Sequence, residues 1–167
     1  GSSLIYAGGC TLNDAFDQDF DQTHNPKRPL PSGSISAQTV WILGSLELIL
    51  GGIFLVMAAG CEKTWVFALI ASVLFYDYIH KKWAGGIIIM GGCRFFLWLV
   101  TATAAGKSEL APQSLIWASV LASYIIGISW FARGESRKKT EPVQYSIILL
   151  FSTPLMALAL LVYWNQL

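Results

Sequence analysis

The chain has 167 residues, of which 54% are hydrophobic and only 13% are charged, and its mean hydropathy is +0.56. Soluble domains usually carry about 25% charged residues, so a water-soluble domain is disfavoured. A disordered chain is excluded, because disorder needs low hydrophobicity and high net charge. Eleven Lys and Arg against ten Asp and Glu give a net charge of +1, which gives no reason to expect a nucleic-acid partner.

Six apolar segments follow one another along the chain. They cover residues 1–13, 37–60, 64–79, 84–106, 111–132 and 143–166. A bilayer's hydrocarbon core needs about 20 mainly apolar residues per helix, so the first segment is too short to span it. We interpret it as the end of a longer helix and expect the chain to be a fragment. Strand alternation is absent and amphipathicity is weak, which favours a polytopic bundle of transmembrane helices, an all-α fold.

The connections between these segments differ in charge. Because successive helices alternate in direction, residues 14–36, 80–83 and 133–142 are expected on one membrane face, and residues 61–63 and 107–110 on the other. The first face holds eight Lys and Arg residues and the second holds two. The positive-inside rule therefore places the first face in the cytoplasm. Most of the acidic residues lie on the same face, so we expect a multi-pass integral membrane protein with its chemistry at that end.

An acidic run closes the first apolar segment: Asn13-Asp14-Ala15-Phe16-Asp17-Gln18-Asp19-Phe20-Asp21. At 100° per helical residue, Asn13 and three of the aspartates share a sector of about 100°, whereas Asp19 points the other way. Carboxylates this close repel, and a divalent cation removes the conflict. Oxygen ligands without His or Cys suit Mg²⁺, which is often shared with substrate phosphates. We predict a Mg²⁺ site at Asn13, Asp14, Asp17 and Asp21. A solvated acidic helix end is the simpler alternative.

A basic loop comes after the acidic run. Lys27 and Arg28 lie between prolines that stiffen the loop, and both can meet a phosphate, Arg28 as a bidentate fork. A basic loop alone more often contacts lipid headgroups. Beside a predicted metal site, binding of a diphosphate is the better interpretation.

Together these residues resemble the UbiA superfamily of intramembrane prenyltransferases. Asn13-Asp14-x-x-Asp17-x-x-x-Asp21 matches that family's first aspartate-rich motif, and Arg28-Pro29-Leu30-Pro31-Ser32-Gly33 matches the family's next segment along the chain. Residues 76–81 resemble the family's Tyr/Lys segment at the cytoplasmic end of a later helix. The resemblance implies a bundle of nine transmembrane helices. This chain, 1–167, would be one incomplete domain from part of the second helix to about the seventh, without the first and last helices.

The resemblance also implies an activity. This is Mg²⁺-dependent transfer of a prenyl group from an isoprenyl diphosphate to an aromatic or other lipophilic acceptor, within the lipid of the membrane. The implied catalytic residues are Asp14, Asp17, Asp21 and Lys81. The residues expected to contact substrate are Arg28, Lys27, Tyr76, Asp77, Arg94, Glu135 and Lys139.

The second aspartate motif of the family is altered in this chain. Glu135 and Lys139 stand where that motif usually has two aspartates. Whether a second Mg²⁺ binds is therefore left open. A catalytically degenerate homologue that binds isoprenoids or lipids without turnover is therefore the alternative. A solute transporter is weaker, because its charges would lie near the bilayer midplane. The stretches 132–135 and 90–94 look most like the branch called EboC.

Two ionisable residues lie inside the spans. Arg94 lies about ten residues into its span, where a charge indicates function by default. It is expected to contact substrate, or alternatively to pair with Glu47 of another helix. Asp77 is expected to bind the acceptor or to support the metal site from further away. We assign no role to His24 or His80.

Overall fold

The computed structural model describes residues 1–81, 83, 85–106, 110–136 and 143–165, and all regular structure in these residues is helical. The amino-terminal part forms α1 (Ser2–Phe16), the short α2 (Gln18–His24) and α3 (Ala37–Ile53), which continues through a π-helical turn, η1 (Phe54–Ala58). The remainder forms α4 (Lys63–Ile79), α5 (Gly86–Ala102), the short 3₁₀ turn η2 (Ala104–Gly106), α6 (Pro112–Ser136) and α7 (Val143–Asn165). The expected all-helical fold is confirmed, and each of the five expected spans corresponds to one helix.

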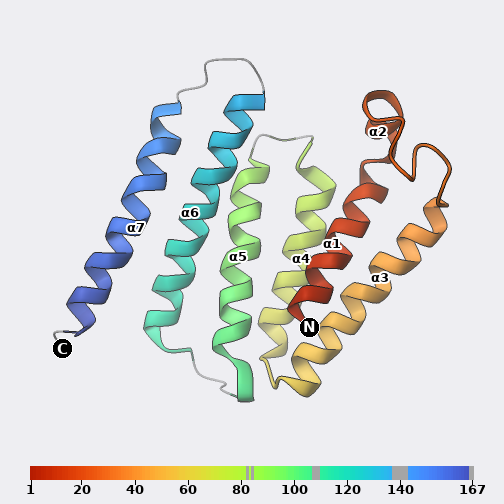
Figure 1. Cartoon of the computed structure of the whole chain (residues 1–167). Coiled ribbons are helices and arrows are strands. Elements are labelled where there is room, and N and C mark those ends of the chain that lie inside the picture. The colour runs from red at the N-terminus through yellow and green to blue at the C-terminus, as the bar shows by residue number, and fades with distance from the viewer. Residues whose placement is uncertain (82, 84, 107–109, 137–142, 166–167) are drawn as a thin grey trace.

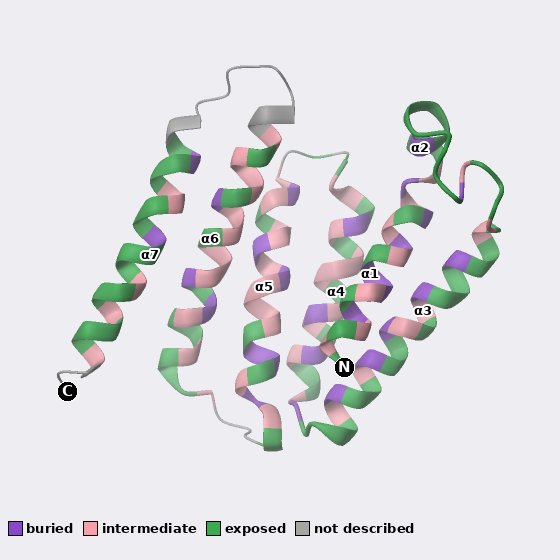
Figure 2. Cartoon of the chain, in the orientation of Figure 1, coloured by how far each residue is buried: buried purple, intermediate pink, exposed green. Residues whose placement is uncertain are grey.

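Three of these helices are long and apolar enough to cross a membrane. They are Ala37–Ala58, Pro112–Arg133 and Tyr145–Trp164, and α5 is a shorter apolar helix. The outward faces carry large apolar side chains, such as Phe151 at 71% and Leu155 at 67% exposure, so green segments cover much of α7 in Figure 2. Such surfaces are unfavourable in water and suit lipid. The chain is therefore an integral membrane protein.

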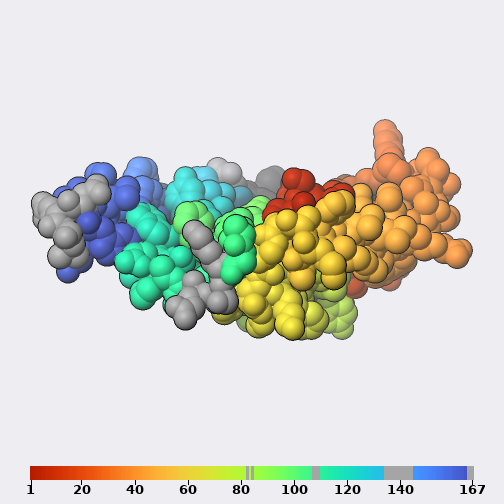
Figure 3. Space-filling view, turned by 90° about the horizontal axis from the view of Figure 1, so that it is seen from below, coloured from red at the N-terminus to blue at the C-terminus, as the bar shows by residue number. Residues whose placement is uncertain are grey.

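The helices stand side by side in a row (Figure 1). From α4 onward each helix packs on the next in the chain, while α1 packs on both α3 and α4. The view from below in Figure 3 shows the elongated outline that results. A small buried core lies among α1, α3, α4 and α5, and includes Leu12, Leu48, Leu69 and Val100.

Glycines allow two of the helix contacts to be close. A Cβ added to Gly8 of α1 would lie 2.9 Å from the carbonyl oxygen of Gly44 in α3. One added to Gly91 of α5 would lie 2.9 Å from the carbonyl oxygen of Ala122 in α6. Small residues permit this approach of backbones within membranes. The neighbouring Gly92 has nothing within 4 Å of its added Cβ, so only one of the pair serves packing.

One end of the row gathers the polar connections. The segment after α1, the end of α4, the start of α5, the end of α6 and the start of α7 all lie at the top in Figure 1. This is the arrangement that the alternation of helix direction predicts. It places the acidic run beside the end of α4.

Candidate functional site

The acidic run lies across a short break between two helices. Asp17 leaves the helical conformation, with φ −89° and ψ 1°, and α2 begins at the next residue. The hydrogen bonds nevertheless continue in helical register, because Asp17 N donates to Asn13 O at 2.9 Å and Asp21 N to Asp17 O at 2.8 Å. Asp17 and Asp21 are therefore turned inward, with 5% and 1% of their surfaces exposed, while Asp19 is exposed as the helical spacing predicts.

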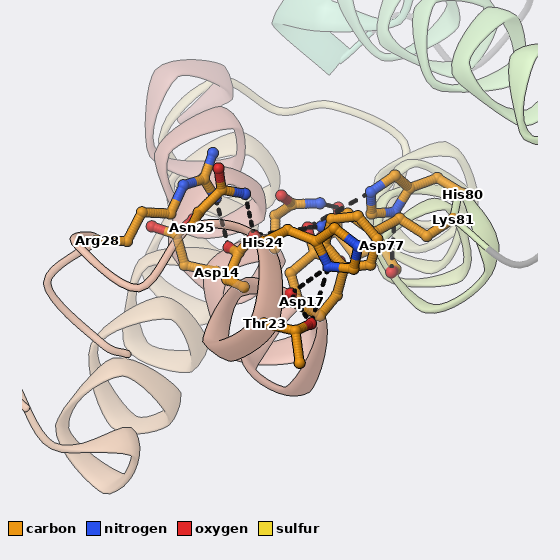
Figure 4. A network of polar contacts seen from close by, with 12 residues as sticks. Asp14, Asp17, Thr23, His24, Asn25, Arg28, Asp77, His80 and Lys81 are labelled. Carbon is orange, nitrogen blue, oxygen red and sulfur yellow. Dashed lines mark hydrogen bonds and ion pairs between the residues drawn. The ribbon is translucent and has the colours of Figure 1, made fainter. Parts of the chain in front are cut away.

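Two basic side chains from different segments meet these carboxylates (Figure 4). From the end of α4, Lys81 places its Nζ 2.8 Å from Asp17 Oδ2 and 3.6 Å from Asp21 Oδ1. From the loop after α2, Arg28 places Nη1 2.7 Å from Asp21 Oδ2 and 3.1 Å from Asp14 Oδ1. The structure thus brings together three predicted aspartates, Asp14, Asp17 and Asp21, which we call the acidic cluster, and two predicted cations.

These neighbours keep Asp21 ionised. Burial raises the pKa of its carboxyl group, but a hydrogen bond from Asn25 and the charges of Lys81 and Arg28 outweigh burial and hold the pKa below its ordinary value. The hydrogen bond from Asn25 Nδ2 to Asp21 Oδ1 measures 2.8 Å. Asp21 therefore retains its negative charge although it is buried.

Asn13, which the sequence predicts as a metal ligand, forms a hydrogen bond to a carboxylate of α4. Its Nδ2 donates to Asp77 Oδ1 of α4 at 3.2 Å. Asp77 is 5% exposed, and its Oδ2 is the only buried side-chain polar atom among the described residues that lacks a hydrogen-bond partner. Because the amide nitrogen of Asn13 is engaged, its carbonyl oxygen is left as a possible ligand.

A cavity of about 430 Å³ opens beside these groups, between α1, α4 and α5. Its lining includes Asn13, Asp14, Asp77 and Arg94, together with aromatic and apolar side chains such as Tyr76. The cavity thus joins the acidic end of the row to the apolar space between the helices. A molecule with a polar head and a hydrocarbon chain matches this division.

His80 is the residue that sequence reasoning missed. Its Nε2 lies 3.5 Å from Asp17 Oδ2, and its ring stacks on Tyr76 with centroids 5.0 Å apart. It also lines the cavity. Its position directly before Lys81, at the end of the same helix, is the signal that places it near the acidic cluster.

The other predicted residues are less closely engaged. Lys27 is exposed in the loop before Arg28. The alternative pairing of Arg94 with Glu47 is wrong, because Glu47 Oε2 accepts a hydrogen bond from Thr11 Oγ1 at 2.9 Å and no ion pair joins it to Arg94 among the described residues. Only the backbone of Glu135 is described, within α6, and Lys139 lies outside the described residues.

The described residues contain no group of three His, Cys, Asp or Glu side chains close enough to form a complete metal site. The oxygens of the acidic cluster are instead shared with Arg28 and Lys81. Mg²⁺ seldom relies on a full set of protein ligands, since it usually keeps waters and takes one or two carboxylates plus phosphate oxygens.

The sequence profile of the UbiA prenyltransferase family matches the chain over residues 1–167. The chain belongs to this family. The resemblance carried by the aspartate motif is thereby confirmed, and no solved structure shows significant similarity to the chain.

Curated members of the UbiA family are similar over parts of the chain. A digeranylgeranylglyceryl phosphate synthase from Sulfolobus acidocaldarius is 34% identical over 114 residues, 68% of this chain and 39% of the relative. A 4-hydroxybenzoate octaprenyltransferase from a Polaromonas species is 28% identical over 123 residues, 72% of this chain and 42% of the relative. A protoheme IX farnesyltransferase from Bacillus pumilus is 42% identical over 86 residues, 50% of this chain and 27% of the relative. The matched regions thus span less than half of each relative.

Proposed function

We propose that the full-length protein transfers a prenyl group from an isoprenyl diphosphate to a lipophilic acceptor within the membrane, with Mg²⁺ bound at the acidic cluster. The observation that carries this proposal is the convergence of the acidic cluster with Lys81 and Arg28, next to a cavity between the helices that Asp14 of the cluster lines. The relatives support it, because their names describe prenyltransferases and a synthase of a prenylated lipid.

The charges at the site suit a divalent cation. The three carboxylates of the acidic cluster face the two cations Arg28 and Lys81, which leaves one negative charge uncompensated. This excess of negative charge favours binding of a cation. From the set Asn13, Asp14, Asp17 and Asp21, one or two carboxylates would hold Mg²⁺ together with diphosphate oxygens and water, and oxygen is the ligand type that this ion prefers. Magnesium would neutralise the diphosphate as a Lewis acid and fix its position.

The cations of the site assist departure of the diphosphate. The C–O bond between the prenyl carbon and the diphosphate breaks, and the bonding electrons leave with the diphosphate. Lys81 and Arg28 would lie next to the leaving diphosphate, where that negative charge develops, and fixed positive charges there stabilise it. Their present partners, the carboxylates of the acidic cluster, hold both side chains in place before substrate arrives.

The allylic cation that remains needs an apolar and aromatic surrounding. Tyr76 lines the cavity next to the polar end, and aromatic faces attract cations by about 0.5–2 kcal/mol. The surrounding helices exclude water, which would otherwise quench the cation. The acceptor then donates an electron pair to the cation and loses a proton. We infer that this site faces the cytoplasm, because the connections at this end carry eight of the chain's eleven basic residues.

Prenyl transfer by membranes that contain the full-length protein tests the proposal. Radiolabelled isoprenyl diphosphates of graded chain length are supplied with Mg²⁺ or with EDTA. We expect transfer that requires Mg²⁺, is lost in Asp17→Asn and is retained in Asp19→Asn, whose exposed carboxylate lies outside the acidic cluster. No transfer across the whole panel would contradict the proposal. It would favour the non-catalytic isoprenoid-binding alternative that the altered second motif, at Glu135 and Lys139, supports.

A further inference from the structure

Phe20 is a large apolar residue at the polar end of the row. It belongs to α2, the short helix that also carries Asp21, and it is 44% exposed. Neither of the hydrophobic clusters found among the described residues includes it. The hydrophobic effect rewards apolar surface that is removed from water, so a ring at this exposure gains only part of that benefit. Its position is therefore explained by something other than core packing.

The ring of Phe20 lies against the ammonium group of Lys81. Lys81 Nζ is 3.9 Å from the ring centroid, well within the distance of about 6 Å at which an aromatic face attracts a cation. The same Nζ lies 2.8 Å from Asp17 Oδ2 and 3.6 Å from Asp21 Oδ1. Two carboxylates and one ring face thus surround an ammonium group that has three N–H donors.

Two neighbours in the sequence hold the ring of Phe20 in place. The ring of His24 stacks on it, with centroids 4.0 Å apart and an angle of 8° between the planes. His24 Nδ1 lies 2.9 Å from Phe20 O and 2.8 Å from Thr23 Oγ1, and the Thr23 hydroxyl donates to Phe20 O at 2.8 Å. An exposed ring is thereby restrained in one orientation beside Lys81.

Lys81 needs such a restraint more than Arg28 does. The guanidinium of arginine is a planar, pre-organised fork, whereas the ammonium of lysine is a compact charge on a flexible four-carbon stem. Under the proposed function, carboxylate oxygens that now pair with Lys81 are among the candidate ligands of Mg²⁺. A ring face attracts the ammonium group without occupying any carboxylate oxygen. It can therefore hold Lys81 while the acidic cluster binds a metal ion.

We propose that Phe20 is a positioning residue for Lys81, whose ammonium group its ring keeps beside the diphosphate when the acidic cluster binds the metal ion. The cation–π contact directs the N–H donors of Lys81 toward the diphosphate oxygens and away from solvent. His24 supports the ring from α2. This inference rests on the proposed function, in which Lys81 assists departure of the diphosphate.

A series of fluorinated phenylalanines at position 20 tests the inference. Each added fluorine draws electron density from the ring face and weakens its attraction for a cation, while the shape of the ring changes little. Full-length protein with mono-, di- or trifluorophenylalanine in place of Phe20 is assayed for prenyl transfer with varied isoprenyl diphosphate. We expect kcat/KM for the diphosphate to fall stepwise, by about 2- to 30-fold in total, which corresponds to a contact of about 0.5–2 kcal/mol. The same series at Phe67, a 74% exposed ring of α4, should have no effect.

Ordinary variants distinguish positioning of Lys81 from a merely structural role. Phe20→Tyr keeps an aromatic face and should retain most activity, whereas Phe20→Leu should lose at least as much as the trifluorinated ring. In the Lys81→Gln background, Phe20→Leu should cause no further loss, because the contact is already absent. Equal activity across the fluorinated series, or a Phe20→Leu loss of the same size in both backgrounds, would overturn the inference.

Chemical labelling separates this inference from the proposed function. Lysines of the purified full-length protein are acetylated with an N-hydroxysuccinimide ester and followed by mass spectrometry, which needs no turnover. We expect Lys81 to react about 2-fold or more faster in Phe20→Leu than in wild type, and Lys63, at the other end of α4, to react equally in both. If this difference is seen but wild type transfers no prenyl group, the proposed function fails while the positioning of Lys81 stands. If wild type transfers prenyl groups and Phe20→Leu changes neither labelling nor kcat/KM, only the inference fails.

Discussion

Lys81 Nζ lies 2.8 Å from Asp17 Oδ2, so the end of α4 is joined to the junction of α1 and α2 (Figure 4). The lysine also lies over the ring of Phe20, with Nζ 3.9 Å from the ring centroid. These contacts direct one cation toward the acidic cluster from a helix distant in the sequence. Under the proposed function, this pair holds a positive charge next to the position proposed for the diphosphate.

Removal of this charge should impair use of the prenyl donor. We expect Lys81→Gln in the full-length protein to lower kcat/KM for the isoprenyl diphosphate by about 100-fold, because a fixed charge at the leaving group is lost. Lys81→Arg should retain more activity than Lys81→Gln. Steady-state kinetics with varied diphosphate measures the effect. Lys63→Gln, at the opposite end of α4, is the control, and an equal loss in both glutamine variants would refute the assignment.

Stability in acid should depend on Asp21. Its pKa in the folded protein is lowered, mainly because the Asn25 hydrogen bond and the charges of Lys81 and Arg28 outweigh burial. The ionised carboxylate therefore contributes its full stabilisation above about pH 4, the ordinary Asp pKa, and this contribution is lost as the pH falls through the lowered value. Thermal unfolding in detergent should show a smaller decrease of Tm in acid for Asp21→Asn than for wild type. Asp19→Asn should follow wild type.

Two adjacent glycines of α5 should differ in their tolerance of a methyl group. Gly91→Ala places a Cβ against Ile126 and the backbone of α6, and overpacking of this kind costs about 1–3 kcal/mol. Gly92→Ala meets nothing within 4 Å and should be neutral or slightly stabilising. Tm values of the two purified variants make the comparison. A lower Tm for Gly92→Ala than for Gly91→Ala would contradict the packing described for α5 and α6.

The sequence predicts the helices and the grouping of aspartates because both depend on local periodicity. The backbone hydrogen bonds of Asp17 and Asp21 keep helical register even across the break at Asp17. The two carboxylates therefore stay on the common face that helical geometry predicts. Alternation of helix direction likewise places Lys81 at the same end as the acidic run. These features need no knowledge of which helices are neighbours.

Contacts between helices are not set by periodicity. The bond from Asn13 to Asp77 and the position of His80 depend on α1 packing against α4. The alternative pairing of Glu47 with Arg94 assumed that their helices are adjacent. In the structure α1 packs against α3, and Thr11 of α1 donates a hydrogen bond to Glu47. Arg94 therefore does not pair with Glu47 and instead lines the cavity. This outcome depends on which helices are neighbours.

Binding of an unreactive prenyl donor tests the central claim most directly. Full-length protein is titrated with farnesyl thiodiphosphate in Mg²⁺ and in EDTA, which separates binding at the acidic cluster from all later steps. We predict binding that requires Mg²⁺, weakens about 10-fold or more in Asp17→Asn and is unchanged in Asp19→Asn. Equal affinity in Mg²⁺ and EDTA, or undiminished affinity in Asp17→Asn, would contradict the account.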